Sequence, residues 1–577
     1  MGLLAPAYRP RRPTETVLYS VVRTHLETFL AHARETYEAP LPRYVEDELR
    51  GYLRCGVFAH GFVRAHCDAC GHDLLVAFSC LGRGVCPSCA GRRMANVAAH
   101  LVDRVLPAVP VRQWVLSLPF ELRALAAFRA DVLAALVRIF VEAVDRRHRA
   151  WAKRVGIGDA PTGAVTHVQR FGSSVNLNVH FHVMVLDGVF TRDDEGRPVF
   201  HPAPAPTGEE LDAIVRRVQE RTARWLARRS TVGTTTHEQE ATPTPLDACA
   251  AIAMQRGAVR VLRDGPDAEE DGGAASENRP PSSHGAVERD GFNLHATVAI
   301  AADDDIARER LMRYGARPPI ALDRLRWLPG GRVAYRIKGL RDGRAKHRVM
   351  TPLEFLARLA AIVPPPRYPL LRYHGVLAPR SPWRRDVVPR APEQSGCGKS
   401  TESGARKSTT APSSPKPQGT RGERATQDGE ERTLAPVRGE APPSPAAATA
   451  VMAEGVHHEG TVSRAKAVGA PSLGERADGD VAFLTPNVLG VRHWSRLLGG
   501  LLYATSPRVD WATLLRRTFD VDVLACPSCG GRLRILGEVT EASTVGRILG
   551  ALGMPIAAPR AARARDPTEL LGEAGAD

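Results

Sequence analysis

Two histidines stand two residues apart in a segment that has the alternation of a β-strand. In NLNVHFHVMVLDGVF, residues 176–190, successive side chains point to opposite faces, so His180 and His182 share one face. Two neighbouring neutral imidazoles can supply half of a divalent-metal site. The alternative interpretation is that both are hydrogen-bonded core residues.

A metal site on this strand needs a third ligand from another segment. Residues 163–171, GAVTHVQRF, are expected to pair antiparallel with the histidine strand across a Gly-Ser-Ser turn, which can bring His167 or Gln169 near the pair. His295, in the predicted strand GFNLHATVAI, is a further candidate. The predicted ligand set of the divalent cation is His180, His182 and Gln169. The periodicity of the strands does not choose among the three candidates for the third ligand.

Cysteines gather in HCDACGHDLLVAFSCLGRGVCPSCAGRRM, residues 66–94. Cys67-x2-Cys70 and Cys86-x2-Cys89 are separated by fifteen residues, a spacing typical of a zinc ribbon. We therefore predict that these four thiolates bind one structural Zn²⁺, against the alternative of four buried free thiols. The same stretch and its flank hold two further cysteines, which we expect to be packed thiols rather than ligands: Cys55 and Cys80.

A third CxxC pair lies far away, at Cys526 and Cys529, with no second pair nearby. It is a candidate for a second zinc site, either as a degenerate ribbon or with borrowed ligands such as His493.

The bulk properties limit the class of protein. A chain of 577 residues is too long for one core, and a formal charge of +15 favours a polyanionic partner. No apolar run reaches the roughly 18 residues of a membrane span, and the start of the chain lacks a secretory signal. We expect a cytoplasmic, nucleoid-associated protein with reduced thiols, no membrane contact and, without a GxxxxGK[ST] loop, no nucleotide cofactor.

Helical and strand patterns alternate irregularly along the chain, which predicts an α+β fold. Helices are expected within residues 13–52, 92–107, 121–155, 303–315 and 352–363. Strands are expected at residues 111–120, 163–190 as a pair, 291–300, and 331–352 as a hairpin.

Several of these segments, taken in order, resemble the rolling-circle transposases of the IS91 family, including relatives carried with antibiotic-resistance genes. The resemblance covers most of residues 14–385 and 485–540. It rests on CDACGHDLLVAFSCLGRGVCPSCAGRRM, QRFGSSVNLNVHFHVMVLDGVF, LMRYGARPPIALDRL, MTPLEFLARLAAIVPPPR, LLRYHGVLAPRS and LLRRTFDVDVLACPSCGGRLRIL.

The resemblance implies an H-U-H endonuclease with an antiparallel sheet. In that class the histidine pair holds Mg²⁺ or Mn²⁺, and a tyrosine attacks single-stranded DNA at element ends and target DNA to give a 5′-phosphotyrosine. The chemistry suits the residue types, because a divalent ion offsets charge on the phosphate and a phenolate is also an acceptable leaving group.

By the family's motif the nucleophile is Tyr314, in the helix before Arg317-Pro-Pro. Some relatives carry a second tyrosine four residues earlier, where this chain has Arg310, so it resembles the single-tyrosine type. Strand transfer then reuses one tyrosine, uses water or a 3′-hydroxyl, or borrows a tyrosine from a second protomer. Tyr373 is the alternative nucleophile, and Tyr335 is expected to pack in a sheet or to stack on a base.

Basic residues near Tyr314 are the predicted DNA contacts, namely Arg313, Arg317 and Arg324. The predicted domains are a helical and zinc-binding domain at 14–106, a nuclease domain at 107–383 with a disordered insertion at 265–290, a disordered linker at 384–480, and a CxxC segment at 481–540. The alternatives are a rolling-circle replication initiator, a metallohydrolase that uses water, and a zinc-ribbon DNA-binding protein without catalysis. The sequence does not give the oligomeric state.

Overall fold

The computed structural model describes residues 10–233, 243–255, 259–262, 270–274, 286–337, 346–389, 511–519 and 521–566. Most of the expected disordered linker, residues 390–480, lies outside the described residues, and so does His493. Within the described ranges, no helix combines the length and apolar character that crossing a membrane requires.

The helices confirm the expected mixed fold. Near the start of the chain, Thr16 caps the first long helix through a hydrogen bond to the backbone amide of Tyr19. The helices are α1 (Val17–Tyr37), α2 (Arg43–Arg54), α3 (Pro87–Arg104), α4 (Phe120–Phe128), α5 (Ala130–Arg154), α6 (Gly208–Gly233), α7 (Pro245–Met254), α8 (Asp305–Gly315), α9 (Pro352–Ile362), α10 (Arg384–Val387), α13 (Trp511–Phe519) and α14 (Ala542–Ala551).

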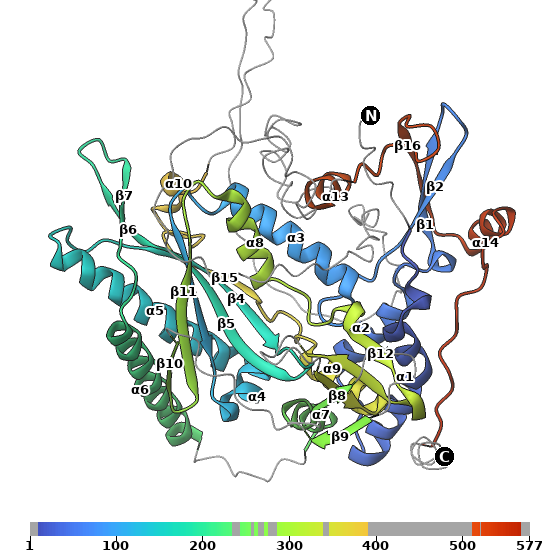
Figure 1. Ribbon diagram of the computed structural model, residues 1–577, viewed down its shortest axis with the longest axis horizontal. Helices are drawn as coiled ribbons and strands as arrows, with labels where there is room; N and C mark the ends of the chain where they lie inside the picture. Colours follow the sequence, from blue (N-terminus) through green and yellow to red (C-terminus); the bar gives the residue numbers. More distant parts are fainter. Residues whose placement is uncertain are drawn as a thin grey trace, which may run out of the picture. The chain divides into compact units, whose positions relative to one another are not determined.

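A six-stranded antiparallel sheet forms the centre of the fold (Figure 1), in the order β10-β11-β3-β5-β4-β15. The histidine strand β5 lies in its interior, paired with β3 on one side and β4 on the other. Its strands are β10 (Ala286–Arg289), β11 (Phe292–Ile300), β3 (Val111–Ser117), β5 (Leu177–Leu186), β4 (Gly163–Phe171) and β15 (Leu371–Gly375).

Three smaller sheets complete the described strands. A three-stranded sheet joins β1 (Phe62–Cys67) and β2 (Asp73–Ala77) with β16 (Leu533–Val539). A five-stranded sheet consists of β12 (Leu325–Trp327), β13 (Val333–Arg336), β14 (Lys346–Met350), β8 (Val259–Leu262) and β9 (Glu270–Ala274). The third is the hairpin β6 (Gly188–Arg192) and β7 (Pro198–Pro202).

Helices cover both faces of the six-stranded sheet. Phe181 and Val183 of β5 pack into the large core with α4, α5 and α9. Met184 belongs to a second core that contains Leu101 of α3 and Leu311 of α8, so these two helices lie over the face that carries the histidine pair (Figure 1). The alternation of the strand therefore divides one segment between a structural face and a face available for chemistry.

Two of the expected domain limits can be compared with the described elements. The segment expected to be disordered, residues 265–290, contains the strands β9 and β10, and the rest of it lies outside the described residues. The C-terminal segment was expected to end near residue 540, but the described structure continues through α14 to residue 566. The expected pairing of residues 163–171 with the histidine strand is confirmed as β4 against β5.

Candidate active site and cysteine clusters

His180 and His182 lie side by side in the interior of the sheet, with ring centroids 4.9 Å apart. They are buried, with exposures of 8% and 3%. Because β3 and β4 flank β5, the register places Ser117 and Gln169 beside His180, and Val115 and His167 beside His182. The face around the pair is therefore built from three adjacent strands.

Each histidine has one ring nitrogen held by the protein. His180 Nδ1 donates to the backbone carbonyl of Asn178 at 2.9 Å, which leaves Nε2 with its lone pair. His182 Nδ1 lies 2.9 Å from the side-chain amide of Gln113. Since an amide can present its oxygen or its nitrogen, the oxygen-facing orientation would likewise free the Nε2 lone pair. Among the described groups nothing bonds to the buried His182 Nε2.

Burial keeps both rings neutral. Desolvation lowers the pKa of His180 to about 4, against the opposing effect of its hydrogen bond to Asn178. Desolvation also holds the pKa of His182 well below its usual value, and the neighbouring His180 acts in the same direction. Neutral imidazoles at neutral pH are the form that binds a divalent cation, so the pair fits a metal site.

Tyr314 lies at the C-terminal end of α8, over the histidine pair. Its ring is 5.3 Å from the ring of His182, centroid to centroid, and perpendicular to it. Asp304 caps the start of this helix by accepting from the backbone amide of Ala307, which explains where α8 begins. The tyrosine is 45% exposed, so part of this residue is accessible from solvent.

Gln169 fastens the end of α8 to the sheet. Its amide nitrogen donates to the backbone carbonyls of Tyr314 at 2.8 Å and Gly315 at 3.0 Å, and its amide oxygen accepts from Arg317 Nε at 3.3 Å. Both ends of the side chain are thus engaged. The geometry argues against the predicted ligand role of Gln169 and gives it a positioning contact with the tyrosine's helix instead.

The other two proposed third ligands share the face of the pair. His167 is paired with His182, its Nε2 is buried without a partner among the described residues, and burial lowers its pKa to about 4. His295 lies one strand further, opposite Val115. Within the described ranges, no third histidine, cysteine or carboxylate joins the pair in a group whose ligand atoms lie within 4.8 Å of one another.

The predicted DNA-binding arginines differ in their surroundings. Arg313 is buried and donates to Glu309 at 2.5 Å, so its guanidinium is engaged within α8, and its contact with DNA stays a prediction. The guanidinium carbon of Arg317 lies 4.9 Å from the centre of the Tyr314 ring. Arg324 is half-buried in a 3-10 turn that leads to β12.

Two other tyrosines were considered in the sequence. Tyr373 lies on β15 opposite Val165, where it packs in the second core with Arg384 over its ring. Tyr335 is 3% exposed and its hydroxyl accepts from the backbone amide of Ala321, so it packs in the sheet and does not offer a face to a base.

The cysteines form two clusters whose membership differs from the prediction. Cys67 and Cys70 do not meet Cys86 and Cys89. The ligand atoms in each cluster lie within 4.8 Å of one another. The clusters are Cys55, Cys80, Cys86 and Cys89, and Cys67, Cys70, Cys526 and Cys529.

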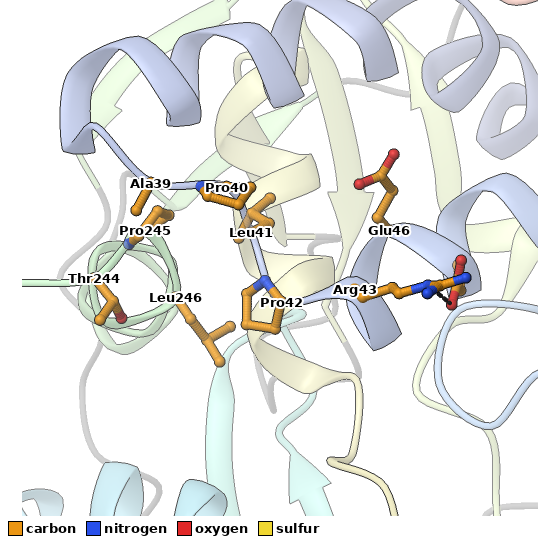
Figure 2. Close-up of a pocket in the computed structure, with 10 residues that line it drawn as sticks. Ala39, Pro40, Leu41, Pro42, Arg43, Glu46, Thr244, Pro245 and Leu246 are labelled. Atoms are coloured by element: carbon orange, nitrogen blue, oxygen red, sulfur yellow. Dashed lines mark ion pairs between the residues drawn. The ribbon is translucent and has the colours of Figure 1, made fainter. Parts of the chain in front are cut away.

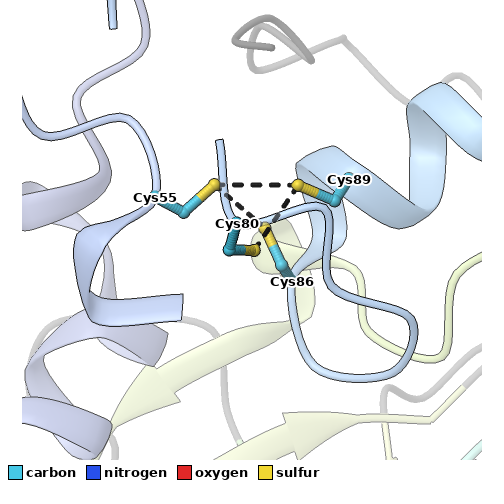
Figure 3. A group of neighbouring side chains, drawn as sticks. All are labelled: Cys55, Cys80, Cys86 and Cys89. Carbon is cyan, nitrogen blue, oxygen red and sulfur yellow. Dashed lines mark hydrogen bonds between the residues drawn. The ribbon is translucent and has the colours of Figure 1, made fainter. Parts of the chain in front are cut away.

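The first cluster joins the end of α2 to the start of α3 (Figure 3). Sulfur–sulfur distances of 3.5 to 3.7 Å are close to the roughly 3.8 Å expected for a tetrahedral zinc with bonds of about 2.3 Å. Cys55 and Cys80, expected to be packed thiols, therefore join Cys86 and Cys89 in a group of four thiols that could hold a metal ion. Glu48 shapes the intervening loop by accepting from the backbone amides of residues 83–85 at 2.7 to 3.0 Å.

Two pockets among the described residues differ in whether they adjoin the histidine site. One pocket, of about 590 Å³, lies between the loop before α2 and the start of α7 (Figure 2), and its lining has proline, leucine and an Arg43–Asp47 ion pair. A smaller pocket of about 130 Å³ is lined by His167, Gln169 and Arg317, together with Arg83 and Arg93. The smaller one adjoins Tyr314's helix and is the one relevant to the site.

Two residues that the sequence analysis missed organise this site. Gln113, a polar residue in the apolar strand VRQWVLS, orients His182, and its isolation in that strand was the available signal. Gly315 lets α8 approach the sheet, since a Cβ there would lie 2.9 Å from the His167 ring.

Two family models match the chain. Residues 21–118 match the model described as "Transposase zinc-binding domain" (Zn_Tnp_IS91), and residues 163–385 match the model described as "Putative transposase" (Y2_Tnp). The first range holds six of the clustered cysteines, and the second holds the histidine pair and Tyr314. The comparisons with curated proteins and with solved structures found no match.

Proposed function

Because this chain belongs to the IS91 family of transposases, which cleave and rejoin DNA, we propose that Tyr314 carries out the cleavage. In this proposal the enzyme nicks single-stranded DNA at element ends, forms a 5′-phosphotyrosine and passes the strand to target DNA in rolling-circle transposition. The single observation that carries the proposal is the position of the Tyr314 ring, 5.3 Å from the His182 ring on the same face of the sheet.

His180 and His182 are the residues that would hold the catalytic cation. The buried Nε2 of His182 has no partner among the described groups, and the Nδ1 contact of His180 leaves its Nε2 available. When bound there, Mg²⁺ or Mn²⁺ offsets the negative charge that builds on the scissile phosphate. His167, whose buried Nε2 has no partner among the described groups, is the neighbouring residue that could complete the ligand set, with water or the DNA phosphate as the alternatives.

The chain's own residues account for the covalent step. The phenolic oxygen of Tyr314 forms a bond to phosphorus and gives its proton to solvent, while the bond from phosphorus to the 3′-oxygen breaks and that oxygen takes up a proton. Gln169 holds the backbone of Tyr314 through this exchange, and the Arg317 guanidinium beside the ring supplies positive charge for the phosphate. The reverse reaction with a new 3′-hydroxyl rejoins the strand.

The small arginine-lined pocket supports a path for the strand next to the nucleophile. Arg83 and Arg93 come from the zinc-binding region and Arg317 from the segment after α8, so both matched regions contribute to it. A single strand bound there would be held mainly through its phosphates.

One tyrosine serves this site in our proposal. Arg310 is exposed one helical turn before Tyr314, at the position where two-tyrosine relatives carry their other nucleophile. A second nucleophile must then be Tyr314 used again, a 3′-hydroxyl, water, or the tyrosine of another protomer.

A covalent trap tests the proposal. The full chain is incubated with Mn²⁺ and a labelled single-stranded oligonucleotide covering the end of its element, and adducts that survive denaturation are counted on a gel. Tyr314→Phe should abolish the adduct and leave oligonucleotide affinity unchanged, because it removes only the attacking oxygen. Tyr373→Phe is the matched control and should keep the adduct.

Other outcomes identify the alternatives. Cleavage without an adduct would indicate a hydrolase that uses water, and binding without cleavage would indicate a non-catalytic DNA-binding protein. Loss of the adduct in Tyr373→Phe with retention in Tyr314→Phe would reverse the assignment of the nucleophile.

A further inference from the structure

We propose that Cys67, Cys70, Cys526 and Cys529 bind a second Zn²⁺, and that this ion clamps the C-terminal segment, residues 511–566, so that it holds α8 in place. The inference rests on the proposed function only in its consequence for Tyr314, which α8 carries. The ion itself and the clamp are properties of the folded chain.

The four sulfur atoms have the arrangement of a tetrahedral thiolate site. Cys67 Sγ lies 3.5 Å from Cys529 Sγ, Cys70 Sγ lies 3.5 Å from Cys526 Sγ, and all four lie within 4.8 Å of one another. A Zn²⁺ with four sulfur ligands at about 2.3 Å places them about 3.8 Å apart. Four soft ligands with no carboxylate favour zinc over magnesium or calcium.

The two halves of the site have the same backbone turn. In each, the glycine after the second cysteine donates its amide to the carbonyl of the first, Gly71 to Cys67 at 2.8 Å and Gly530 to Cys526 at 2.9 Å. Both glycines have positive φ, 75° and 74°, which side chains disfavour. Two matching CxxCG knuckles, one from each end of the chain, therefore face each other as in one zinc ribbon.

The strand that leads into the first knuckle also pairs with the strand that follows the second. β16 pairs antiparallel with β1, from Cys67 opposite Leu533 to Phe62 opposite Val539. A separate small core joins Val63 and Val76 of the N-terminal hairpin to Leu515 of α13 and to Leu533. The C-terminal segment is thus attached by a sheet edge and apolar contacts as well as by the thiolates.

From this anchored segment, Arg517 of α13 reaches the helix of the nucleophile. Arg517 is 1% exposed, and its guanidinium donates to Glu309 of α8 at 2.9 Å and to Asp103 of α3 at 3.0 Å. Glu309 also accepts from Arg313, four residues later in α8. Removing Arg517 would leave the buried carboxylate of Glu309 and the half-buried carboxylate of Asp103 with less positive charge, which disfavours the closed packing.

The consequence is a chain of contacts from the second metal to the nucleophile. Zinc fixes the C-terminal knuckle, the knuckle and β16 fix α13, and Arg517 ties α13 to both helices that cover the histidine face. Arg517 is therefore a positioning residue for Tyr314: it contacts α8 at Glu309, in the middle of the helix, whereas Gln169 contacts the helix at Tyr314.

The zinc content of the full chain tests the site. Purified without added metal or chelator, the wild type should carry two zinc ions per chain by native mass spectrometry, one in each cysteine cluster. Cys526→Ser/Cys529→Ser should carry one. Cys249→Ala, which changes a buried cysteine of α7 outside both clusters, should still carry two. One zinc in the wild type, or two in the double variant, would overturn the site.

Hydrogen exchange tests the clamp without DNA. Peptides from α8, residues 305–315, should exchange at least tenfold faster in Cys526→Ser/Cys529→Ser and in Arg517→Gln than in the wild type. Peptides from α5, residues 130–154, should be unchanged, which reports that the core is folded. If the double variant also exposes α5, Arg517→Gln alone decides, since it leaves all eight thiolates in place.

Unchanged α8 exchange in a folded Arg517→Gln variant would overturn the clamp even if the second zinc is present. Neither the zinc content nor the hydrogen exchange involves DNA cleavage, so both results are independent of whether the covalent adduct forms. If both hold and the adduct never forms, only the proposed function fails.

Discussion

Gly315 offers a test of how closely α8 must approach the sheet for Tyr314 to react. An ideal Cβ at this position would lie 2.9 Å from Cγ and Cδ2 of His167 and 3.0 Å from Cε of Met184. Ordinary carbon–carbon contacts begin at about 3.5 Å, so Gly315→Ala overlaps the imidazole by about 0.6 Å. Gly315 is not among the residues with positive φ, so the substitution adds crowding without backbone strain.

The helix end is the part that should yield. Met184 Cε is the end of a flexible side chain, whereas His167 is a ring on a buried strand paired on both sides. Lifting the end of α8 by this amount moves Tyr314 and strains the Gln169 contacts. Because misplacement of a reacting group by about 1 Å can cost a hundredfold, we expect adduct formation to slow by roughly ten- to a hundredfold. The free energy of unfolding should fall by only about 1 to 3 kcal/mol.

The measurement compares initial rates of adduct formation and urea unfolding for the wild type and Gly315→Ala. Gly208→Ala is the matched control, since a Cβ there meets nothing within 4 Å. It should keep both the rate and the stability. A Gly315→Ala enzyme with a wild-type rate and stability would refute the reasoning that close packing of α8 on His167 sets the position of the tyrosine.

The remaining predictions concern the supports of the site. His182→Ala should weaken Mn²⁺ binding to the zinc-loaded chain at least tenfold in titration calorimetry, and Gln113→Leu should weaken it by roughly tenfold, because Gln113 only orients the ring; unchanged affinities would exclude the histidine pair. Glu48→Gln weakens three hydrogen bonds to backbone amides and should lower the free energy of unfolding by about 1 to 3 kcal/mol in urea. Arg170→Met should cost about 1 to 3 kcal/mol, since it leaves buried carbonyls at the ends of α4 and α9 without their donor; an unchanged free energy of unfolding would contradict that role.

The histidine strand could be predicted because its information is local. Alternation over ten residues and a short turn define which side chains share a face, and the structure has β4 and β5 paired with Gln169 opposite His180. The contacts of the Gln169 side chain, in contrast, depend on a segment that is distant in the sequence. They depend on where α8 ends above the sheet, so the amide that the sequence suggested as a ligand instead binds the carbonyls of Tyr314 and Gly315.

The cysteine grouping could not be obtained from spacing alone. All CxxC pairs have the same spacing, so the spacing does not identify which pairs share an ion. The pairing of β1 with β16, across more than 460 residues of sequence, decides which knuckles meet. A local signal did exist. Gly71 and Gly530 follow their cysteines and supply the left-handed turn of a knuckle, whereas Ala90 follows Cys89 in the first turn of α3.

Arg313 shows why the basic character of the chain does not by itself identify the arginines that bind DNA. An arginine beside the expected nucleophile of a basic chain is a natural DNA contact, yet Glu309 stands four residues earlier on the same helix face. That spacing favours an ion pair within the helix, and the structure buries the pair. The direction in which α8 presents this face depends on α3 and α13, which neither residue encodes.

The packing of α3 explains why a transposase of this kind would need its cysteine clusters near a site that uses no thiol. α3 begins inside the first cluster, at Cys86 and Cys89, and ends at Asp103, which binds Arg517 from the C-terminal segment. Along its length it packs on α8. If zinc fixes the start of α3 and the Arg517 contact fixes its end, α8 can settle in only one position on the histidine face. Metal loss would then displace Tyr314 from the histidines without any direct contact between zinc and the reacting groups.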